Sequence, residues 1–188
     1  MVNLLGILIS FLIPLESTSG EKRVAASPET AKKLIVLGCE IYLEKGAGLC
    51  SGFSDDAYRN VGVELCSADN FDVWKKVDAV LCVQAPGREN LERMKPHSLV
   101  VGLLAPHGNQ ELANTLRLGS LSALSLELLP RISRAQSADA LSSQANIAGY
   151  KAVLLGAAAL DRYFPMLMTA AGTVQPAKVV ILGAGVAG

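Results

Sequence analysis

The stretch that divides this chain runs from Pro130 to Tyr150 and reads PRISRAQSADALSSQANIAGY. If the part after Arg134 is helical, small apolar residues recur at three- and four-residue steps on one face, and polar residues gather on another. The apolar face holds Ala135, Ala138, Leu141, Ala145 and Ala148, and the polar face holds Gln136, Asp139, Ser143 and Asn146. Serine, asparagine and glycine are poor residues for a helix interior, so the stretch gives up helix propensity for another purpose.

Two interpretations of this stretch are open from its pattern alone. One is close packing of two helices through small residues. The other is a polar surface with Arg131 and Arg134 at its entrance, suited to a ligand that carries an amide and phosphates. Arginines just before a helix N-terminus place fixed donors where anions already tend to bind.

Before residue 129 the sequence alternates apolar runs with short helical patterns that are bounded by caps and glycines. Continuous apolar runs of this length are typical of strands buried on both faces of a parallel sheet. Strands are expected at 5–13, 40–44, 63–66, 79–83, 99–104 and 123–126, and helices at 28–37, 54–62 and 110–118. This rhythm predicts an α/β domain over residues 1–128, with a doubly wound, mainly parallel sheet of the Rossmann-like or flavodoxin-like kind.

Residues 129–164 are expected to form a signature loop and a long linking helix, which Pro165 stops. Residues 165–188 then begin a second unit, in which the apolar run at 179–182 predicts a buried strand. This strand leads directly into GAGVAG, which begins at Gly183.

A GxGxxG pattern directly after a strand favours a dinucleotide-binding turn. The first glycine makes the tight turn, the second lets the backbone approach the pyrophosphate, and the third allows close packing. The helix that holds the phosphate, and a ribose-binding acid about 20 residues further on, would lie beyond Gly188. We therefore expect a truncated Rossmann domain, and weak or no NAD binding by this chain alone.

The composition argues against several classes of partner. The 17 basic and 17 acidic residues cancel, and no basic stripe carries interleaved aromatics, so nucleic acid is not an expected partner. The apolar run at 2–13 is shorter than the roughly 20 residues that cross a bilayer, and it has no positive n-region or A-x-A site. We expect a buried first strand there, and no membrane-spanning segment.

The cysteines and histidines do not form a metal-binding pattern. No CxxC spacing occurs, which favours buried, reduced thiols in a cytosolic protein. His97 and His107 lack metal-ligand spacing to the cysteines or to each other, so no metal is expected. The four cysteines are Cys39, Cys50, Cys66 and Cys82.

Three stretches together resemble the nucleotide-binding alpha subunit of proton-translocating NAD(P) transhydrogenase, in the family that also contains alanine dehydrogenase. They are RISRAQSADALSSQANIAGY at 131–150, GEKRVAASPE at 20–29 and VVILGAGVAG at 179–188. The resemblance implies hydride transfer between NAD(H) on this chain and NADP(H) on a partner beta subunit, coupled to proton translocation through membrane-domain subunits. It also implies a homodimer of the NAD-binding domain and a place on the cytoplasmic side, peripheral to the inner (plasma) membrane.

The same resemblance implies which residues contact the cofactor. In the first stretch they are Arg131, Ile132, Ser133, Gln136, Asp139 and Ser142. In the glycine turn they are Gly183, Gly185, Val186 and Gly188. Gln136 corresponds to a residue between the two nucleotides, while Asp139 and Ser142, with Arg131, correspond to groups that orient the nicotinamide ring. The expected catalytic residues are therefore Arg131, Gln136 and Asp139.

Each of these assignments has a structural alternative. Arg131 could pair with an acid, Asp139 could cap its helix, and Ser142 could be small for packing. Asn146 and Tyr150 are expected to be structural residues.

Amino-acid dehydrogenation is the second hypothesis for function, and a non-catalytic, truncated subunit module is the third. Transfer between two nicotinamides needs little acid–base chemistry, whereas an amino-acid dehydrogenase needs an acid or base and a cation for the substrate carboxylate. By resemblance to alanine dehydrogenase, Arg23 matches the arginine, Cys82 stands at the lysine position, and no histidine follows 100–104, with His107 falling beyond the site. We expect the amino-acid chemistry to be lost and Arg23 to form a structural salt bridge.

Overall fold

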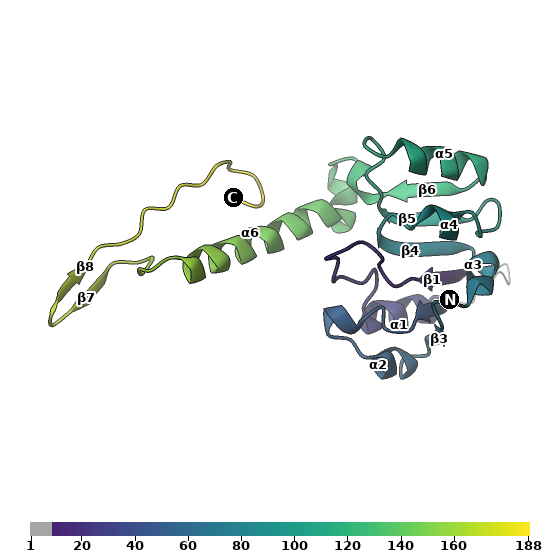
Figure 1. Cartoon of the computed structure of the whole chain (residues 1–188), viewed down its shortest axis with the longest axis horizontal. Helices are drawn as coiled ribbons and strands as arrows, with labels where there is room; N and C mark the ends of the chain where they lie inside the picture. The colour runs from purple at the N-terminus through teal and green to yellow at the C-terminus, as the bar shows by residue number, and fades with distance from the viewer. Residues whose placement is uncertain (1–8) are drawn as a thin grey trace. The chain divides into compact units, whose positions relative to one another are not determined.

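A computed structural model describes residues 9–188, which form two compact units divided between Leu128 and Leu129. The first unit is built on one six-stranded sheet in the order β3-β2-β1-β4-β5-β6 (Figure 1). The strands are β1 (Ser10–Ile13), β2 (Glu40–Glu44), β3 (Glu64–Cys66), β4 (Ala79–Gln84), β5 (Leu99–Leu103) and β6 (Ser122–Ser125). The part of the expected first strand at 5–8 lies outside the described residues.

All neighbouring strands of this sheet are parallel, which confirms the predicted fold class. The strand order is that of the Rossmann fold, so the flavodoxin-like alternative, with its order 2-1-3-4-5, is wrong. The strand order reverses between β1 and β4. In doubly wound sheets, the crevice at the carboxyl ends of such a strand pair is where ligands bind.

Helices cover both faces of the sheet. The helices are α1 (Pro28–Val36), α2 (Asp55–Arg59), α3 (Phe71–Lys76), α4 (Arg88–Leu91) and α5 (Gln110–Leu118), with short 3-10 turns η1 (Leu49–Ser51) and η2 (Leu126–Leu128). Adjacent residues of β1 point to opposite faces, so Leu12 packs with Trp74 of α3 in one core and Ile13 packs with Tyr58 of α2 in the other. The chain is therefore buried on both sides of its central strands.

The second unit contains η3 (Ser133–Ala138), the twenty-residue helix α6 (Ala140–Ala159) and an antiparallel hairpin, β7 (Leu167–Thr169) and β8 (Gly172–Val174). The prediction of an α-helix directly after Arg134 is wrong, because η3 comes first and α6 begins only after Asp139. The linking helix also ends at Ala159, before the expected stop at Pro165.

The predicted strand at 179–182 is not formed. Its residues are extended and exposed, with Leu182 96% and Val180 81% exposed. A strand needs a neighbouring backbone to satisfy its N–H and C=O groups, and β7 and β8 of this unit pair with each other. The apolar run is therefore a strand sequence without a sheet to join.

The cysteines only partly follow the prediction of buried thiols. All four are free, and burial raises the pKa of Cys66 to about 11 and that of Cys82 to about 12. Cys39 is half-buried and Cys50 is exposed, so the prediction of burial is wrong for Cys50, which lies in the surface turn η1. Within residues 9–188, no helix combines the length and apolar character that a bilayer crossing requires.

Candidate functional site

The residues just before α6 line a pocket of about 220 Å³. They are Leu129, Pro130, Arg131, Ile132, Ala135, Gln136 and Asp139. The 3-10 geometry of η3 folds this segment on itself, since the Ala135 amide donates to the Ile132 carbonyl at 2.9 Å. Four of the expected site residues therefore meet in one concavity, whereas Ser133 and Ser142 lie outside its lining.

Asp139 is both a helix cap and a charged wall of the pocket. Its carboxylate accepts the Ser142 hydroxyl at 2.6 Å and the Ser142 backbone amide at 2.9 Å. These two hydrogen bonds, and more weakly the charge of Arg131, lower the pKa of Asp139 below its ordinary value. The carboxylate is therefore ionised at neutral pH, and its capping role fixes where α6 begins.

Arg131 and Gln136 are exposed at the pocket. In the described part of the chain Arg131 has no ion pair, so the alternative that it serves a structural salt bridge lacks an acid partner. A guanidinium group offers five fixed donors, and a side-chain amide offers both donors and an acceptor. The pocket can therefore bind a planar ligand that carries a carboxamide.

The GAGVAG turn lies against α6 in the same unit. Gly183 has φ of +108°, a backbone conformation that favours glycine, and a side chain on Gly188 would collide with the Gly183 carbonyl. A side chain on Gly185 would meet nothing within 4 Å, so the backbone there is open to a ligand, and Val186 is exposed. On α6, Gly149 lies so close to Ala187 that a methyl group at Gly149 would collide with the Ala187 carbonyl.

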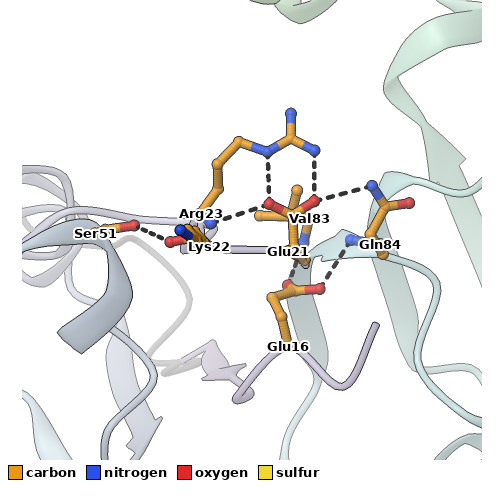
Figure 2. Close-up of polar contacts among 7 residues, drawn as sticks. All are labelled: Glu16, Glu21, Lys22, Arg23, Ser51, Val83 and Gln84. Carbon is orange, nitrogen blue, oxygen red and sulfur yellow. Dashed lines mark hydrogen bonds and ion pairs between the residues drawn. The ribbon is translucent and has the colours of Figure 1, made fainter. Parts of the chain in front are cut away.

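A second polar cluster lies in the first unit, around the strand pair where the order reverses (Figure 2). The Arg23 guanidinium donates from Nε and Nη2 to the two Glu21 oxygens at 2.8 and 2.6 Å, which confirms the predicted structural salt bridge. These hydrogen bonds lower the pKa of Glu21 to about 2. The Gln84 amide also donates to Glu21, at 3.1 Å.

Glu16 fixes the same cluster to β4. Its carboxylate accepts the backbone amides of Val83 at 2.6 Å and Gln84 at 3.0 Å (Figure 2). Burial raises the pKa of Glu16, although the two amides act in the opposite direction. The loop after β1 is therefore held over the carboxyl end of β4.

The β4 residue that reaches the Arg23 pair is Gln84. Sequence reasoning had assigned the lysine position to Cys82, but the Cys82 thiol is buried and donates to the Val101 carbonyl at 3.3 Å. Strand alternation was the signal that could have found Gln84, since it lies two residues from Cys82 at the strand end. The cluster therefore presents a neutral amide and a neutralised arginine. Residues 9–188 contain no group of three His, Cys, Asp or Glu side chains placed to hold a metal.

Comparisons with known proteins identify the family of both units. Residues 12–148 match the alanine dehydrogenase/PNT N-terminal domain, and residues 152–188 match the alanine dehydrogenase/PNT C-terminal domain. The first of the polypeptides that make up the NAD(P) transhydrogenase alpha subunit of Rhodospirillum rubrum is 44% identical over 181 residues, covering 94% of this chain and 47% of that protein.

Two solved structures are similar over nearly the whole chain. Transhydrogenase from Sinorhizobium meliloti has a TM-score of 0.89 and 42% identity, covering 95% of this chain and 51% of that one. An L-alanine dehydrogenase has a TM-score of 0.81 and 28% identity, covering 95% of this chain and 49% of that one.

The chain thus spans about half the length of these relatives, and it is more similar to the transhydrogenases, at 42–44% identity, than to the alanine dehydrogenase, at 28%. Its sequence is homologous to the N-terminal half of a transhydrogenase alpha subunit. The chain belongs to the alanine dehydrogenase/PNT family.

Proposed function

We propose that this chain is the NAD(H)-binding portion of a proton-translocating NAD(P) transhydrogenase, exchanging hydride with NADP(H) held by a partner beta subunit. The observation that carries the proposal is the pocket of Arg131, Gln136 and Asp139 at the start of α6, the helix that the glycine turn also contacts. The named activity of the R. rubrum and S. meliloti relatives supports it.

The residues present fit a nicotinamide and its carboxamide. When bound, the two nicotinamides supply the hydride chemistry, so the residues of this chain need only bind and orient. Arg131 donates to the carboxamide oxygen, and the ionised Asp139 balances the charge of Arg131 and holds it toward the pocket. Gln136, exposed at the rim, faces the nucleotide on the partner subunit.

The remaining contacts hold the rest of the dinucleotide. Ile132 and Ser133 contact NAD beside Arg131, and Ser142 acts through its two hydrogen bonds to Asp139. In the glycine turn, the open backbone at Gly185 receives the pyrophosphate, with Gly183, Val186 and Gly188 forming the surrounding turn.

The same proposal fixes the expected assembly. The NAD-binding domain forms a homodimer, joins a beta subunit and membrane-domain subunits, and lies on the cytoplasmic side of the inner membrane. Proton translocation is then carried by those membrane-domain subunits and not by the residues of the chain described above.

An alanine dehydrogenase-like activity is the second candidate, favoured by the L-alanine dehydrogenase fold match. The site in the first unit opposes it, because Glu21 already binds the Arg23 guanidinium on two nitrogens. Gln84, which stands beside this pair, has no charge or proton to exchange at neutral pH.

One experiment separates the candidates. The full-length protein, with its beta and membrane-domain subunits, is assayed for hydride transfer from NADPH to an NAD analogue, and separately for alanine-dependent NAD reduction. We expect the first activity and not the second. Alanine turnover would support the dehydrogenase, and a folded protein with neither activity would support a non-catalytic module.

A further inference from the structure

Gly149 is the point at which the glycine turn meets α6. A methyl group at this position would collide with the Ala187 carbonyl oxygen and lie 3.0 and 3.1 Å from the Ala187 carbonyl carbon and Cα. All three are backbone atoms, so they cannot rotate away as the end of a flexible side chain would. The observed contact between helix and turn therefore requires glycine at 149.

The other end of the same helix carries the pocket. Asp139 caps α6 and lines the pocket, and Gly149 lies ten residues further along. A rise of 1.5 Å per residue separates the two positions by about 15 Å along one rigid helix. The spacing between the pocket and the turn is thus set by the helix and by how closely the turn approaches it.

Resting on the proposed function, we propose that Gly149 is a positioning residue that seats the dinucleotide turn against α6, so that the phosphate-binding turn and the nicotinamide pocket stand in register for one NAD(H). Replacing it displaces the turn as a whole without changing its internal shape. The nicotinamide pocket also stays intact, since η3 and the Asp139–Ser142 cap lie at the far end of the helix from the substitution.

Two other glycines provide matched controls. Gly156, on the same helix, has open space where a side chain would meet only the Phe164 ring at 3.9 Å, an ordinary contact. Gly188 differs in that a side chain there would collide with Gly183, inside the turn itself. Gly156→Ala therefore tests a helix glycine without the contact, and Gly188→Ala tests distortion of the turn.

The test measures two ligands on the full-length protein. ADP occupies only the half of the site that the turn holds, and NADH occupies both halves. For Gly149→Ala we expect NADH affinity to fall by about tenfold or more, with ADP affinity within about twofold of wild type, because only the two-ended ligand senses the spacing. Gly188→Ala should weaken both ligands, and Gly156→Ala neither.

Hydrogen exchange provides a second measurement that does not depend on ligand. In Gly149→Ala, amides at 183–188 should exchange faster while those of 140–148 keep their protection. Unchanged NADH affinity in Gly149→Ala, or equal losses of NADH and ADP, would overturn the positioning role. A wild-type protein that binds neither ligand would instead overturn the proposed function, and the positioning role with it.

Discussion

Ser142 donates both its hydroxyl and its backbone amide to the Asp139 carboxylate, at 2.6 and 2.9 Å. This pair decides where α6 begins, and it holds a negative charge in the wall of the pocket that contains Arg131. The structural and functional interpretations of Asp139 are therefore both compatible with the geometry, and substitution can separate them.

Asp139→Asn is expected to keep the helix cap and impair the site. Asparagine caps helices about as well as aspartate, but it is neutral and cannot balance Arg131. Helix content by circular dichroism should match wild type, while NADH affinity in the full-length protein falls. Asp139→Ala, which removes the cap as well, should lose both. Equal NADH affinity in wild type and Asp139→Asn would leave Asp139 as a cap only.

The Glu21–Arg23 pair predicts a specific pH dependence of stability. The folded pKa of Glu21, about 2, lies below its ordinary value of 4.5. Its contribution to the free energy of unfolding is therefore complete above about pH 5 and is lost as the pH falls toward 2. Because Arg23 is 41% exposed, screening reduces the effect to on the order of 1 kcal/mol.

Urea unfolding at pH 7 and pH 3 measures this difference. Wild type should lose more stability on acidification than Glu21→Gln, in which the titrating group is absent. Glu29→Gln serves as the control, since the Glu29–Lys33 pair is exposed on α1 and its removal should leave the pH dependence close to wild type. Identical pH dependence in all three proteins would contradict the assignment.

Gly102→Ala should destabilise the first unit by about 1–3 kcal/mol. A methyl group at Gly102 of β5 would lie 2.6 Å from the Cys82 carbonyl oxygen and 2.7 Å from its sulfur, and the strands cannot separate without breaking their ladder. Gly87→Ala, where nothing lies within 4 Å, should change the urea midpoint little. A Gly102→Ala midpoint equal to that of Gly87→Ala would show that the sheet absorbs the methyl group.

Gln136→Asn is expected to slow hydride transfer in the complete complex with little loss of NADH affinity. The shorter side chain removes a rim contact between the two nucleotides, and a displacement of about an ångström can lower the rate by on the order of a hundredfold. Stopped-flow measurement of the transfer step, beside an NADH titration, checks both expectations. An unchanged transfer rate would remove Gln136 from the space between the rings.

The sequence predicted the features of the fold that depend on local pattern. Buried apolar runs predicted the parallel sheet, and Ser27 and Ser54 predicted two helix starts at which their side chains do accept backbone amides. The short helices α3 and α4 were not assigned, because six and four residues show no helical period.

The failures involve contacts that a pattern does not contain. Periodicity suggested a helix from 135, but the Asp139 cap delays it until after η3. The run at 179–182 has strand composition without partner strands. Gln84 was missed because its contact with Glu21 joins residues 63 positions apart. The resemblance, and not periodicity, identified the site residues, and their cofactor roles stay predictions.

The central claim is that the segment before α6 binds the nicotinamide end of NAD(H). Calorimetric titration of NADH into full-length wild type, Arg131→Ala and Arg134→Ala tests it most directly, because both arginines precede the helix but only Arg131 lines the pocket. We expect Arg131→Ala to bind at least about tenfold more weakly, the loss of one charged hydrogen bond, with Arg134→Ala within about twofold of wild type. Equal affinity in wild type and Arg131→Ala would contradict the account.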